Sequence, residues 1–336
     1  MTDFLILRLS SLGDIVHTLP AFSALRRNFP EAKIRWAVEQ KGREILDLVP
    51  GIDEIIVIGR KKWLKIVKNL RRRDQIVLDF QGLVKSALLA FLSGSKRKIG
   101  FHRKNCKEPL ASLFYSETPA PFPEEEEHVI AKNLRLLTRL GIREEVFDFP
   151  LVLPEEVRRS VESELQALGY RNDQKLILYN VGAAWETKRW FPERWAELIE
   201  KTRFSGSFPL LLWGNNEEQN LAQTVKEKTG VALTRFLSVK EVIGLVRAAF
   251  LLVSGDTFAL QVACALAVPA IALFGPTNPR RNGPFRPTDR SVFTKLECNP
   301  CYQRTCPTLE CLRAIAVEDV AVAISKVWVD HESSAD

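Results

Sequence analysis

Residues 4–14 read FLILRLSSLGD, and residues 250–256 read FLLVSGD. In each stretch an apolar run with the length of a strand leads into Gly-Asp, and a helical pattern of apolar residues follows. Two such junctions, far apart in one chain, predict two α/β domains, each with a helix N-terminus that could receive an anion. The alternative for either aspartate, Asp14 or Asp256, is that it merely caps its helix.

Strand and helix patterns alternate along both halves of the chain. Strands are predicted over residues 4–9, 34–38, 54–58, 75–79, 176–180, 210–213, 250–254 and 270–274. Helical periodicity covers residues 15–28, 43–48, 63–72, 83–93, 128–140, 192–202, 217–229, 239–248, 260–266 and 317–329. This alternation predicts an α/β protein with two doubly wound parallel sheets. Pro150 and Pro154 mark the expected boundary between residues 1–154 and 155–336, and the last helix could pack back on the N-terminal domain.

Length and composition restrict the class of protein. A chain of 336 residues exceeds the usual size of a single core, and its 46% hydrophobic and 26% charged residues are ordinary for a globular protein. Neither a membrane-spanning run nor a signal peptide is recognisable, so we expect a cytoplasmic protein. The glycine-rich dinucleotide fingerprint and the Walker lysine motif are both missing, which disfavours an oxidoreductase or a nucleoside triphosphatase.

Positive charge is concentrated in two stretches. Residues 60–73 contain eight Lys or Arg and no acid, interleaved with apolar residues as in a basic amphipathic helix. The second stretch comprises Lys96, Arg97, Lys98, Arg103, Lys104 and Lys107. Such a helix could pack on its own domain, or it could meet an anionic membrane or an anionic acceptor. Nucleic acid is not an expected partner, because no recognised binding motif accompanies the charge.

Three blocks could carry chemistry. Asp14, at the carboxyl end of a strand, could accept a proton from a hydroxyl. Lys188 and Arg189 arrive just before a helix that starts at Pro192, where a cation can meet a phosphate, although both could be solvated loop charges. Glu218 follows another strand and could bind a ribose diol, or it could be a first-turn helix residue.

Four separated blocks resemble one enzyme family. They are residues 10–20 (SSLGDIVHTLP), 79–86 (DFQGLVKS), 108–115 (EPLASLFY) and 274–277 (FGPT). Taken together they resemble glycosyltransferase family 9, the ADP-heptose:lipopolysaccharide heptosyltransferases. The first three blocks look most like the heptosyltransferase I branch, whose members add the first heptose to the Kdo region of lipid A.

The resemblance implies a fold and a set of roles. It implies two Rossmann-like domains in the GT-B arrangement around a central cleft. The N-terminal domain would bind the acceptor and the C-terminal domain the nucleotide sugar. The transfer would invert the configuration at the anomeric carbon and would require no metal. Asp14 would be the general base. The donor, ADP-heptose, would be bound by Thr187, Lys188, Glu218, Asp256, Thr257, Phe258 and Ala259: Lys188 beside Thr187 at the diphosphate, Glu218 at the ribose, Asp256 at the heptose, and Thr257 with the amides that follow it at the phosphates.

The resemblance also implies an acceptor, an anionic glycolipid of the Kdo-lipid A type. We therefore expect peripheral contact with the cytoplasmic face of the inner membrane. Because the head group is phosphorylated, Arg60, Lys61, Lys62 and Lys85 could steer it toward the site.

The second junction departs from the family pattern. The family usually has Asp-Thr-Gly-x-x-His there, whereas this chain has Phe258 in place of the glycine and Gln261 in place of the histidine. A side chain at Phe258 narrows the room beside the backbone and could favour another nucleotide or sugar.

A cluster of cysteines is the second unusual feature. Four of the six cysteines, Cys298, Cys301, Cys306 and Cys311, fall within fourteen residues. Close thiols in a cytoplasmic protein suggest a structural zinc or iron ion more than disulfides. The alternative is a surface loop of reduced, unliganded cysteines.

Two other functions remain open at this point. One keeps the donor and changes the acceptor to a protein or another glycan. The other is a catalytically silent protein that binds a sugar nucleotide, which the residues at 258 and 261 favour and the presence of Asp14 and Lys188 disfavours. The acceptor hydroxyl, the nucleotide and the oligomeric state do not follow from the sequence.

Overall fold

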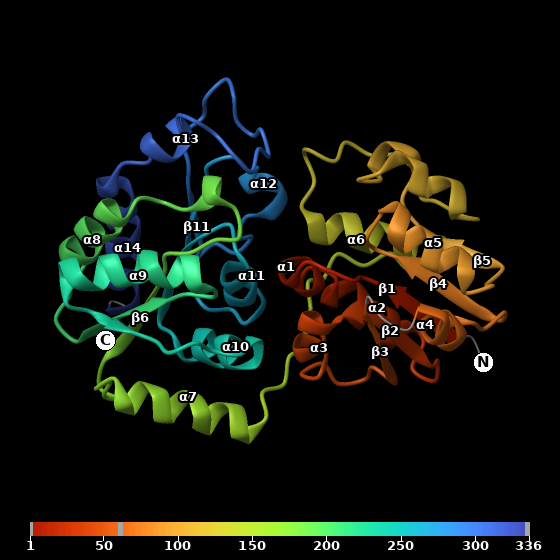
Figure 1. Ribbon diagram of the computed structural model, residues 1–336, viewed down its shortest axis with the longest axis horizontal. Coiled ribbons are helices and arrows are strands. Elements are labelled where there is room, and N and C mark those ends of the chain that lie inside the picture. Colours follow the sequence, from red (N-terminus) through yellow and green to blue (C-terminus); the bar gives the residue numbers. More distant parts are fainter. Residues whose placement is uncertain (1–2, 60–62, 333–336) are drawn as a thin grey trace. The chain divides into compact units, whose positions relative to one another are not determined.

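The computed structural model describes residues 3–59 and 63–332, and the chain divides into two compact units, Met1–Val152 and Leu153–Asp336 (Figure 1). The boundary predicted from the sequence, after residue 154, lies two residues further along the chain. Among the described residues, no helix combines the length and the apolar character needed to cross a membrane.

Unit 1 contains a five-stranded sheet in the order β3-β2-β1-β4-β5, in which every pair of neighbours is parallel. Its strands are β1 (Asp3–Leu7), β2 (Ile34–Glu39), β3 (Glu54–Ile58), β4 (Gln75–Asp79) and β5 (Arg97–Ile99). Its α-helices are α1 (Leu12–Val16), α2 (Leu19–Asn28), α3 (Gln40–Leu46), α4 (Trp63–Leu70), α5 (Val84–Leu92) and α6 (Val129–Leu137), and its 3-10 helices are η1 (Arg103–Asn105), η2 (Pro109–Phe114) and η3 (Thr138–Leu140).

Unit 2 contains a six-stranded sheet in the order β11-β10-β9-β6-β7-β8, again with parallel neighbours. Its strands are β6 (Lys175–Asn180), β7 (Ser207–Leu212), β8 (Ala232–Leu233), β9 (Leu251–Gly255), β10 (Ala270–Leu273) and β11 (Arg290–Val292). Its helices are α7 (Glu155–Ala167), η4 (Glu186–Lys188), α8 (Pro192–Lys201), α9 (Asn216–Thr229), α10 (Val239–Ala248), α11 (Phe258–Ala265), α12 (Pro279–Asn282), α13 (Glu310–Arg313) and α14 (Val317–Glu332).

Each sheet is built outward from an inner strand. The chain starts at β1, moves through β2 to β3, and then returns to the other side of β1 with β4 and β5. Unit 2 does the same from β6 through β7 and β8, followed by β9, β10 and β11. The strand order therefore reverses between β1 and β4 and between β6 and β9. At such a point the connections after the two neighbouring strands run in opposite directions. Ligands of open α/β sheets bind there, at the carboxyl ends of the two strands. The predicted doubly wound α/β class is therefore confirmed in both units.

Apolar strands account for the two cores. Four of the five residues of β1 are buried, and all five of β9 are, as expected of strands covered by helices on both faces. The sequence left open whether the last helix packs on the N-terminal domain. In the structure, Val320, Ile324 and Trp328 of α14 belong to the core of unit 2.

Candidate active site

Asp14 lies in the first turn of α1, the helix that follows β1. Its Oδ1 is 3.0 Å from a guanidinium nitrogen of Arg8, and its Oδ2 accepts hydrogen bonds from the backbone N–H and the hydroxyl of Ser11 at 3.1 and 3.0 Å. The side chain nevertheless remains 39% exposed. The carboxylate is therefore oriented by its neighbours and still open to a ligand.

The environment of Asp14 keeps it ionised. Burial alone would raise the pKa of its carboxyl, but the positive charge of Arg8, the nearby His17 and the hydrogen bonds from Ser11 outweigh that effect and hold the pKa well below its ordinary value. Arg8 itself is buried and donates to the carbonyl of Phe80, so its guanidinium is fixed in place. At neutral pH the group is thus a carboxylate that can accept, but not donate, a hydrogen bond.

The loop that carries Asp14 is held by the connection after β4. Gln81 Oε1 accepts from the backbone N–H groups of Leu9 and Ser10 at 2.9 and 3.3 Å. The Gln81 backbone N–H in turn donates to Asp79 Oδ1 at 2.9 Å. Asp79 is fully buried, which raises the pKa of its carboxyl. The two connections that diverge at the reversal of this sheet are therefore tied together around the candidate base.

In unit 2 the structure brings Lys188 and Asp256 together. Lys188 follows β6, Asp256 follows β9, and Lys188 Nζ lies 2.7 Å from Asp256 Oδ2. The two side chains are only 14% and 8% exposed, so this is a nearly buried ion pair. The sequence predicted both residues as donor-binding but did not predict that they would pair.

Thr257, Phe258 and Ala259 form the start of α11. Thr257 is the N-cap: its Oγ1 accepts from Leu260 N and from Asn180 Nδ2 at the end of β6. The first amides of a helix have no partner within it, so Phe258 and Ala259 carry N–H groups suited to an anion. Gln261, where the family has histidine, is buried and donates to the carbonyl of Asn282 at 2.9 Å.

Glu218 is buried beside the end of β7. Its Oε2 accepts from Gly214 N at 2.8 Å and its Oε1 from Asn215 Nδ2 at 2.6 Å. Burial raises the pKa of this carboxyl. A Cβ on Gly182 would lie 2.3 Å from Oε2, so the glycine after β6 is required for the carboxylate to sit there. Glu218 is thus a fixed hydrogen-bond acceptor in the first turn of α9. This position fits both of its predicted roles, a ligand of a ribose diol and a first-turn helix residue.

Thr187 and Trp185 contact the segment that contains the cysteines. Thr187 is buried, and its hydroxyl donates to the carbonyl of Gln303 at 2.7 Å. Next to Gln303, the Arg304 guanidinium carbon lies 5.1 Å from the centre of the Trp185 ring, while Lys188 Nζ lies 4.4 Å from the same centre. Two cations thus share one indole, and the described residues include no carboxylate paired with Arg304. Sequence reasoning missed Arg304, because nothing in the spacing connects residue 304 with residue 185.

The four clustered cysteines lie in the segment that runs from β11 into α13. Cys298, Cys301 and Cys306 are exposed and Cys311 is buried, and all are free thiols. Among the residues that the structure describes, no three His, Cys, Asp or Glu side chains are grouped so as to hold an ion. Hydrogen bonds from the Leu309 and Thr308 backbone lower the pKa of Cys306, and burial raises that of Cys311.

Of the four predicted acceptor-binding cations, only Lys85 lies among the residues that the structure describes. Arg60, Lys61 and Lys62 lie outside the described residues. Lys85 is exposed near the start of α5 and forms an ion pair of 2.7 Å with Glu39 at the end of β2. Because Glu39 N donates to Leu9 O, Lys85 belongs to the same sheet edge as the Asp14 loop.

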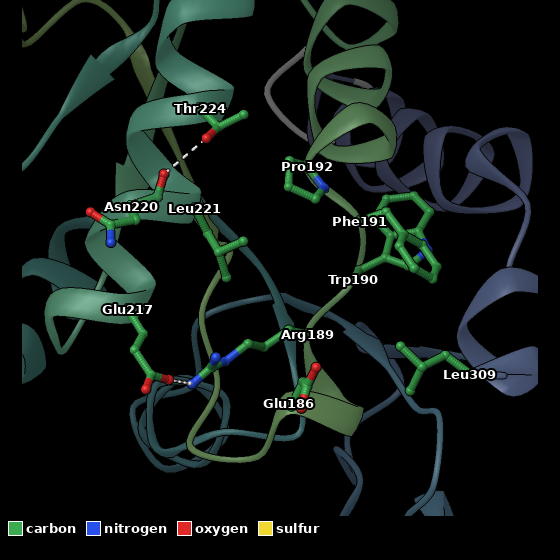
Figure 2. Close-up of a pocket in the computed structure, with 10 residues that line it drawn as sticks. All are labelled: Glu186, Arg189, Trp190, Phe191, Pro192, Glu217, Asn220, Leu221, Thr224 and Leu309. Carbon is green, nitrogen blue, oxygen red and sulfur yellow. Dashed lines mark hydrogen bonds and ion pairs between the residues drawn. The ribbon is translucent and has the colours of Figure 1, made fainter. Parts of the chain in front are cut away.

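A separate cavity of about 480 Å³ lies in unit 2 between α8 and α9 (Figure 2). The ion pair between Arg189 and Glu217, at 2.8 Å, spans one side of it. The remaining lining residues are Glu186, Trp190, Phe191, Pro192, Asn220, Leu221, Thr224 and Leu309. None of the predicted donor-binding residues lines this cavity, so it is not the predicted donor site.

Known proteins resemble this chain in sequence and in fold. The family model for glycosyltransferase family 9 (heptosyltransferase) matches residues 63–312. Lipopolysaccharide heptosyltransferase 1 of Pseudomonas aeruginosa is 29% identical over 318 residues, which cover 90% of this chain and 86% of the relative. A glycosyl transferase family 9 structure from Veillonella parvula superimposes with a TM-score of 0.82 at 21% identity, covering 98% of this chain and 97% of the other. The E. coli heptosyltransferase WaaC, solved with ADP, superimposes with a TM-score of 0.76 at 24% identity, covering 97% of this chain and all (100%) of the other.

Proposed function

Because the chain belongs to glycosyltransferase family 9, we propose that it transfers heptose from ADP-heptose to the Kdo region of lipid A during synthesis of the lipopolysaccharide inner core. The observation that carries this proposal is the Asp14 carboxylate, held ionised by Arg8 and still exposed. The relatives named lipopolysaccharide heptosyltransferase 1 support the substrate, and WaaC has also been solved with ADP-2-deoxy-2-fluoro heptose.

On the acceptor side, we assign Asp14 the role of general base. A carboxylate with a low pKa is a weak base, so it first orients the acceptor hydroxyl by accepting its hydrogen bond. The hydroxyl becomes acidic only as its oxygen bonds to the anomeric carbon, and the proton then passes to Asp14. The hydroxyl attacks the face opposite the departing phosphate, so the transfer inverts the anomeric configuration.

On the donor side, the bond between the anomeric carbon and the diphosphate breaks and leaves its electron pair on ADP. We assign stabilisation of that charge to Lys188 and to the first amides of α11, at Phe258 and Ala259. Asp256 holds the Lys188 ammonium in place and faces the heptose. Thr187 fixes the loop that carries Lys188, and Thr257 caps the start of α11. Glu218 accepts a hydrogen bond from the ribose. This chemistry needs no metal ion.

The alternative functions are distinguished by the acceptor and by turnover. An enzyme with a protein or another glycan acceptor would retain donor chemistry and ignore Kdo-lipid A. A silent binder would take up ADP without turnover, and Phe258 with Gln261 are the residues that favour it.

The test is transfer from ADP-heptose by the purified protein, with and without Kdo2-lipid A, followed by mass spectrometry of the lipid. We expect a heptosylated lipid that requires both substrates. Binding of ADP without transfer to this lipid would redirect the proposal to another acceptor, and failure to bind ADP would overturn the donor assignment.

Substitution of Arg8 should change the pH dependence of transfer. Protonated Asp14 cannot accept a proton, so activity falls as the pH drops below its pKa. In the wild type that pKa is held low by Arg8, and kcat should stay flat down to about pH 5. In Arg8→Met this cation no longer opposes the effect of burial, so the pKa of Asp14 rises. We therefore expect kcat to fall as the pH is lowered from about 6 to 4.

The pH–kcat profile checks this, with circular dichroism and thermal unfolding of the variant as the control for the folding of unit 1. A matched control is Arg97→Met, which removes the surface partner of Glu117 in the same unit and should leave the profile flat. A flat profile for Arg8→Met would contradict the role assigned to the Arg8–Asp14 pair.

Arg304 should contribute to binding of the diphosphate. Asp256 offsets part of the charge that Lys188 offers to ADP, so a second cation would strengthen diphosphate binding, and Arg304 lies near the same Trp185 ring as Lys188. Arg304→Gln should raise the Kd for ADP about ten-fold, the effect of one charge-assisted hydrogen bond, and leave the Kd for adenosine unchanged.

Isothermal titration calorimetry measures both constants. Arg313→Gln is the matched control, because Arg313 is also exposed and lies 5.0 Å from an aromatic ring, that of Phe191. Equal losses for ADP and adenosine would indicate general disruption of the loop instead of a phosphate contact.

We retain a structural metal on Cys298, Cys301, Cys306 and Cys311 as a proposal. Its support is the spacing in the sequence, because the four thiols fall within fourteen residues and three of them are exposed. Protein purified without chelator should contain about one equivalent of zinc or iron by elemental analysis, and less than about a tenth of an equivalent would remove the proposal. Cys301→Ser should abolish the metal, whereas Cys264→Ser, at a buried cysteine of α11, should not.

We also propose that the protein works at the cytoplasmic face of the inner membrane as a peripheral protein. The support is the proposed acceptor, a lipid whose head group must reach Asp14, with Arg60, Lys61, Lys62 and Lys85 steering it.

A further inference from the structure

Two helices of unit 1 expose large apolar side chains next to each other. On α5 the residues at 85, 88 and 91 follow one helical stripe, and Leu88 and Phe91 on it are 37% and 57% exposed. On η2, Leu110 and Leu113 are 62% and 77% exposed, and residues three apart share one face of a 3-10 helix. We refer to Leu88, Phe91, Leu110 and Leu113 as the apolar ridge.

The ridge is one surface, because α5 and η2 pack against each other. The rings of Phe91 and Phe114 meet edge to face with centres 6.0 Å apart. The Glu108 carboxylate, just before η2, accepts from Val84 N at the start of α5 at 2.6 Å. Exposed apolar side chains that are scattered singly need no explanation, but a contiguous cluster marks an interaction surface.

Positive charge borders this ridge. Within the second basic stretch of the sequence, Arg97 is paired with Glu117 and Lys98 donates to the Ser95 carbonyl. Arg103, Lys104 and Lys107, in and after η1 and directly before η2, are exposed, and no ion pair joins them to a described carboxylate. We refer to these three residues as the basic border. Surfaces that bind in the interface of an anionic bilayer combine exposed leucine and phenylalanine side chains with neighbouring cations, as this one does.

The ridge is connected to the candidate base. Glu108 N donates to Gly82 O, and the adjacent Gln81 holds the loop that precedes Asp14. Lys85, on the ridge stripe of α5, is paired with Glu39 at the end of β2. The surface therefore belongs to the same carboxyl edge of the sheet at which Asp14 lies.

We propose that the apolar ridge and its basic border form the surface by which unit 1 docks on an anionic phospholipid bilayer. The ridge side chains enter the boundary between head groups and acyl chains, and Arg103, Lys104 and Lys107 meet the lipid phosphates. The inference rests on the proposed function in one respect, that the acceptor is embedded in such a bilayer. Docking there would present the sheet edge with Asp14 to the lipid head groups.

The experiment is co-sedimentation of the full-length protein with vesicles of phosphatidylcholine alone or with about 30% phosphatidylglycerol, in the absence of donor and lipopolysaccharide. The wild type should bind the anionic vesicles. Leu110→Ser/Leu113→Ser should weaken that binding by about ten-fold or more, because two large side chains no longer enter the interface. Lys104→Ser/Lys107→Ser should weaken it by about five-fold per lysine and remove the preference for anionic vesicles.

The matched control is Val146→Ser/Val152→Ser, which removes two apolar side chains of unit 1 that are 63% and 61% exposed but lie outside the ridge. It should bind like the wild type. Wild-type binding by the leucine variant, or equal losses in the control, would overturn the proposal. So would loss of a dimer by the leucine variant with vesicle binding unchanged, since a second copy of the chain would then cover the ridge. Because no donor or acceptor is present, these outcomes are independent of whether the protein transfers heptose.

Discussion

Asp14→Asn is expected to lower kcat for heptose transfer by about 10³-fold while the Kd for ADP keeps its wild-type value. Asparagine has the size of aspartate and can still accept the hydrogen bonds of Ser11 at its carbonyl oxygen, but it cannot take a proton from the acceptor hydroxyl. The measurement is the initial rate with ADP-heptose and Kdo2-lipid A, together with ADP titration by calorimetry.

The experiment separates the proposed role of Asp14 as general base from its contact with Ser11 at the start of α1. Asp14 and Ser11 form a capping arrangement at the start of α1, and the loss of a cap typically lowers the free energy of unfolding by about 1 kcal/mol. If Asp14 were only a capping residue, Asp14→Asn would retain kcat, because the asparagine carbonyl oxygen can still accept from Ser11. Asp53→Asn is the control, because Asp53 is also an acid of unit 1 paired with an arginine, Arg26, and should lose stability without losing kcat.

Much of the fold could be predicted because its inner strands are long apolar runs. The strands around β1 and β9 were predicted within a few residues, and so were α8, α9 and α10. The edge strands β5 and β11 have three residues each, read RKI and RSV, and are too short and too polar to show periodicity. The predicted helix over residues 15–28 is two helices, since the chain turns at His17 and Thr18 and the second helix starts at Leu19 with Pro20 in its first turn.

Helix α7 was missed although the sequence contains its signal. Val157, Val161 and Leu165 are spaced four apart and are all buried, and two glutamates follow Pro154 in the first turn. The many charges of this segment, placed directly after the proline-marked boundary, obscured that pattern.

The candidate site was predictable residue by residue but not as a network. The motifs predicted an acid at 14 and a cation at 188, because their types and positions at strand ends suit that chemistry. They did not predict that Arg8 forms an ion pair with Asp14. Nor did they predict that Gln81 accepts hydrogen bonds from the loop before Asp14, or that the Arg304 guanidinium lies near the Trp185 ring. These partners come together through tertiary contacts between segments that no spacing relates.

Lys188→Met should have the second large effect, on both activity and stability. The ammonium is the cation assigned to the diphosphate, so kcat/KM for ADP-heptose should fall by about 10²–10³-fold. The variant also leaves Asp256 without its partner at 8% exposure, and removal of one member of a buried pair lowers the free energy of unfolding by about 3–5 kcal/mol. Lys201→Met is the control, because Lys201 pairs with Glu318 at 3.0 Å on the surface of the same unit, and its loss should leave the free energy of unfolding close to that of the wild type.

The double variant Lys188→Met/Asp256→Asn separates these two effects. Asparagine has no charge to leave unpaired, so the double variant should recover most of the stability that Lys188→Met loses. Activity should not recover, since the cation for the departing ADP is still missing. Urea unfolding and steady-state kinetics on the four proteins of the cycle provide both readouts. If activity returned together with stability, Lys188 would act only as the structural partner of Asp256, and the charge of the leaving group would have to be stabilised by Arg304 and the start of α11.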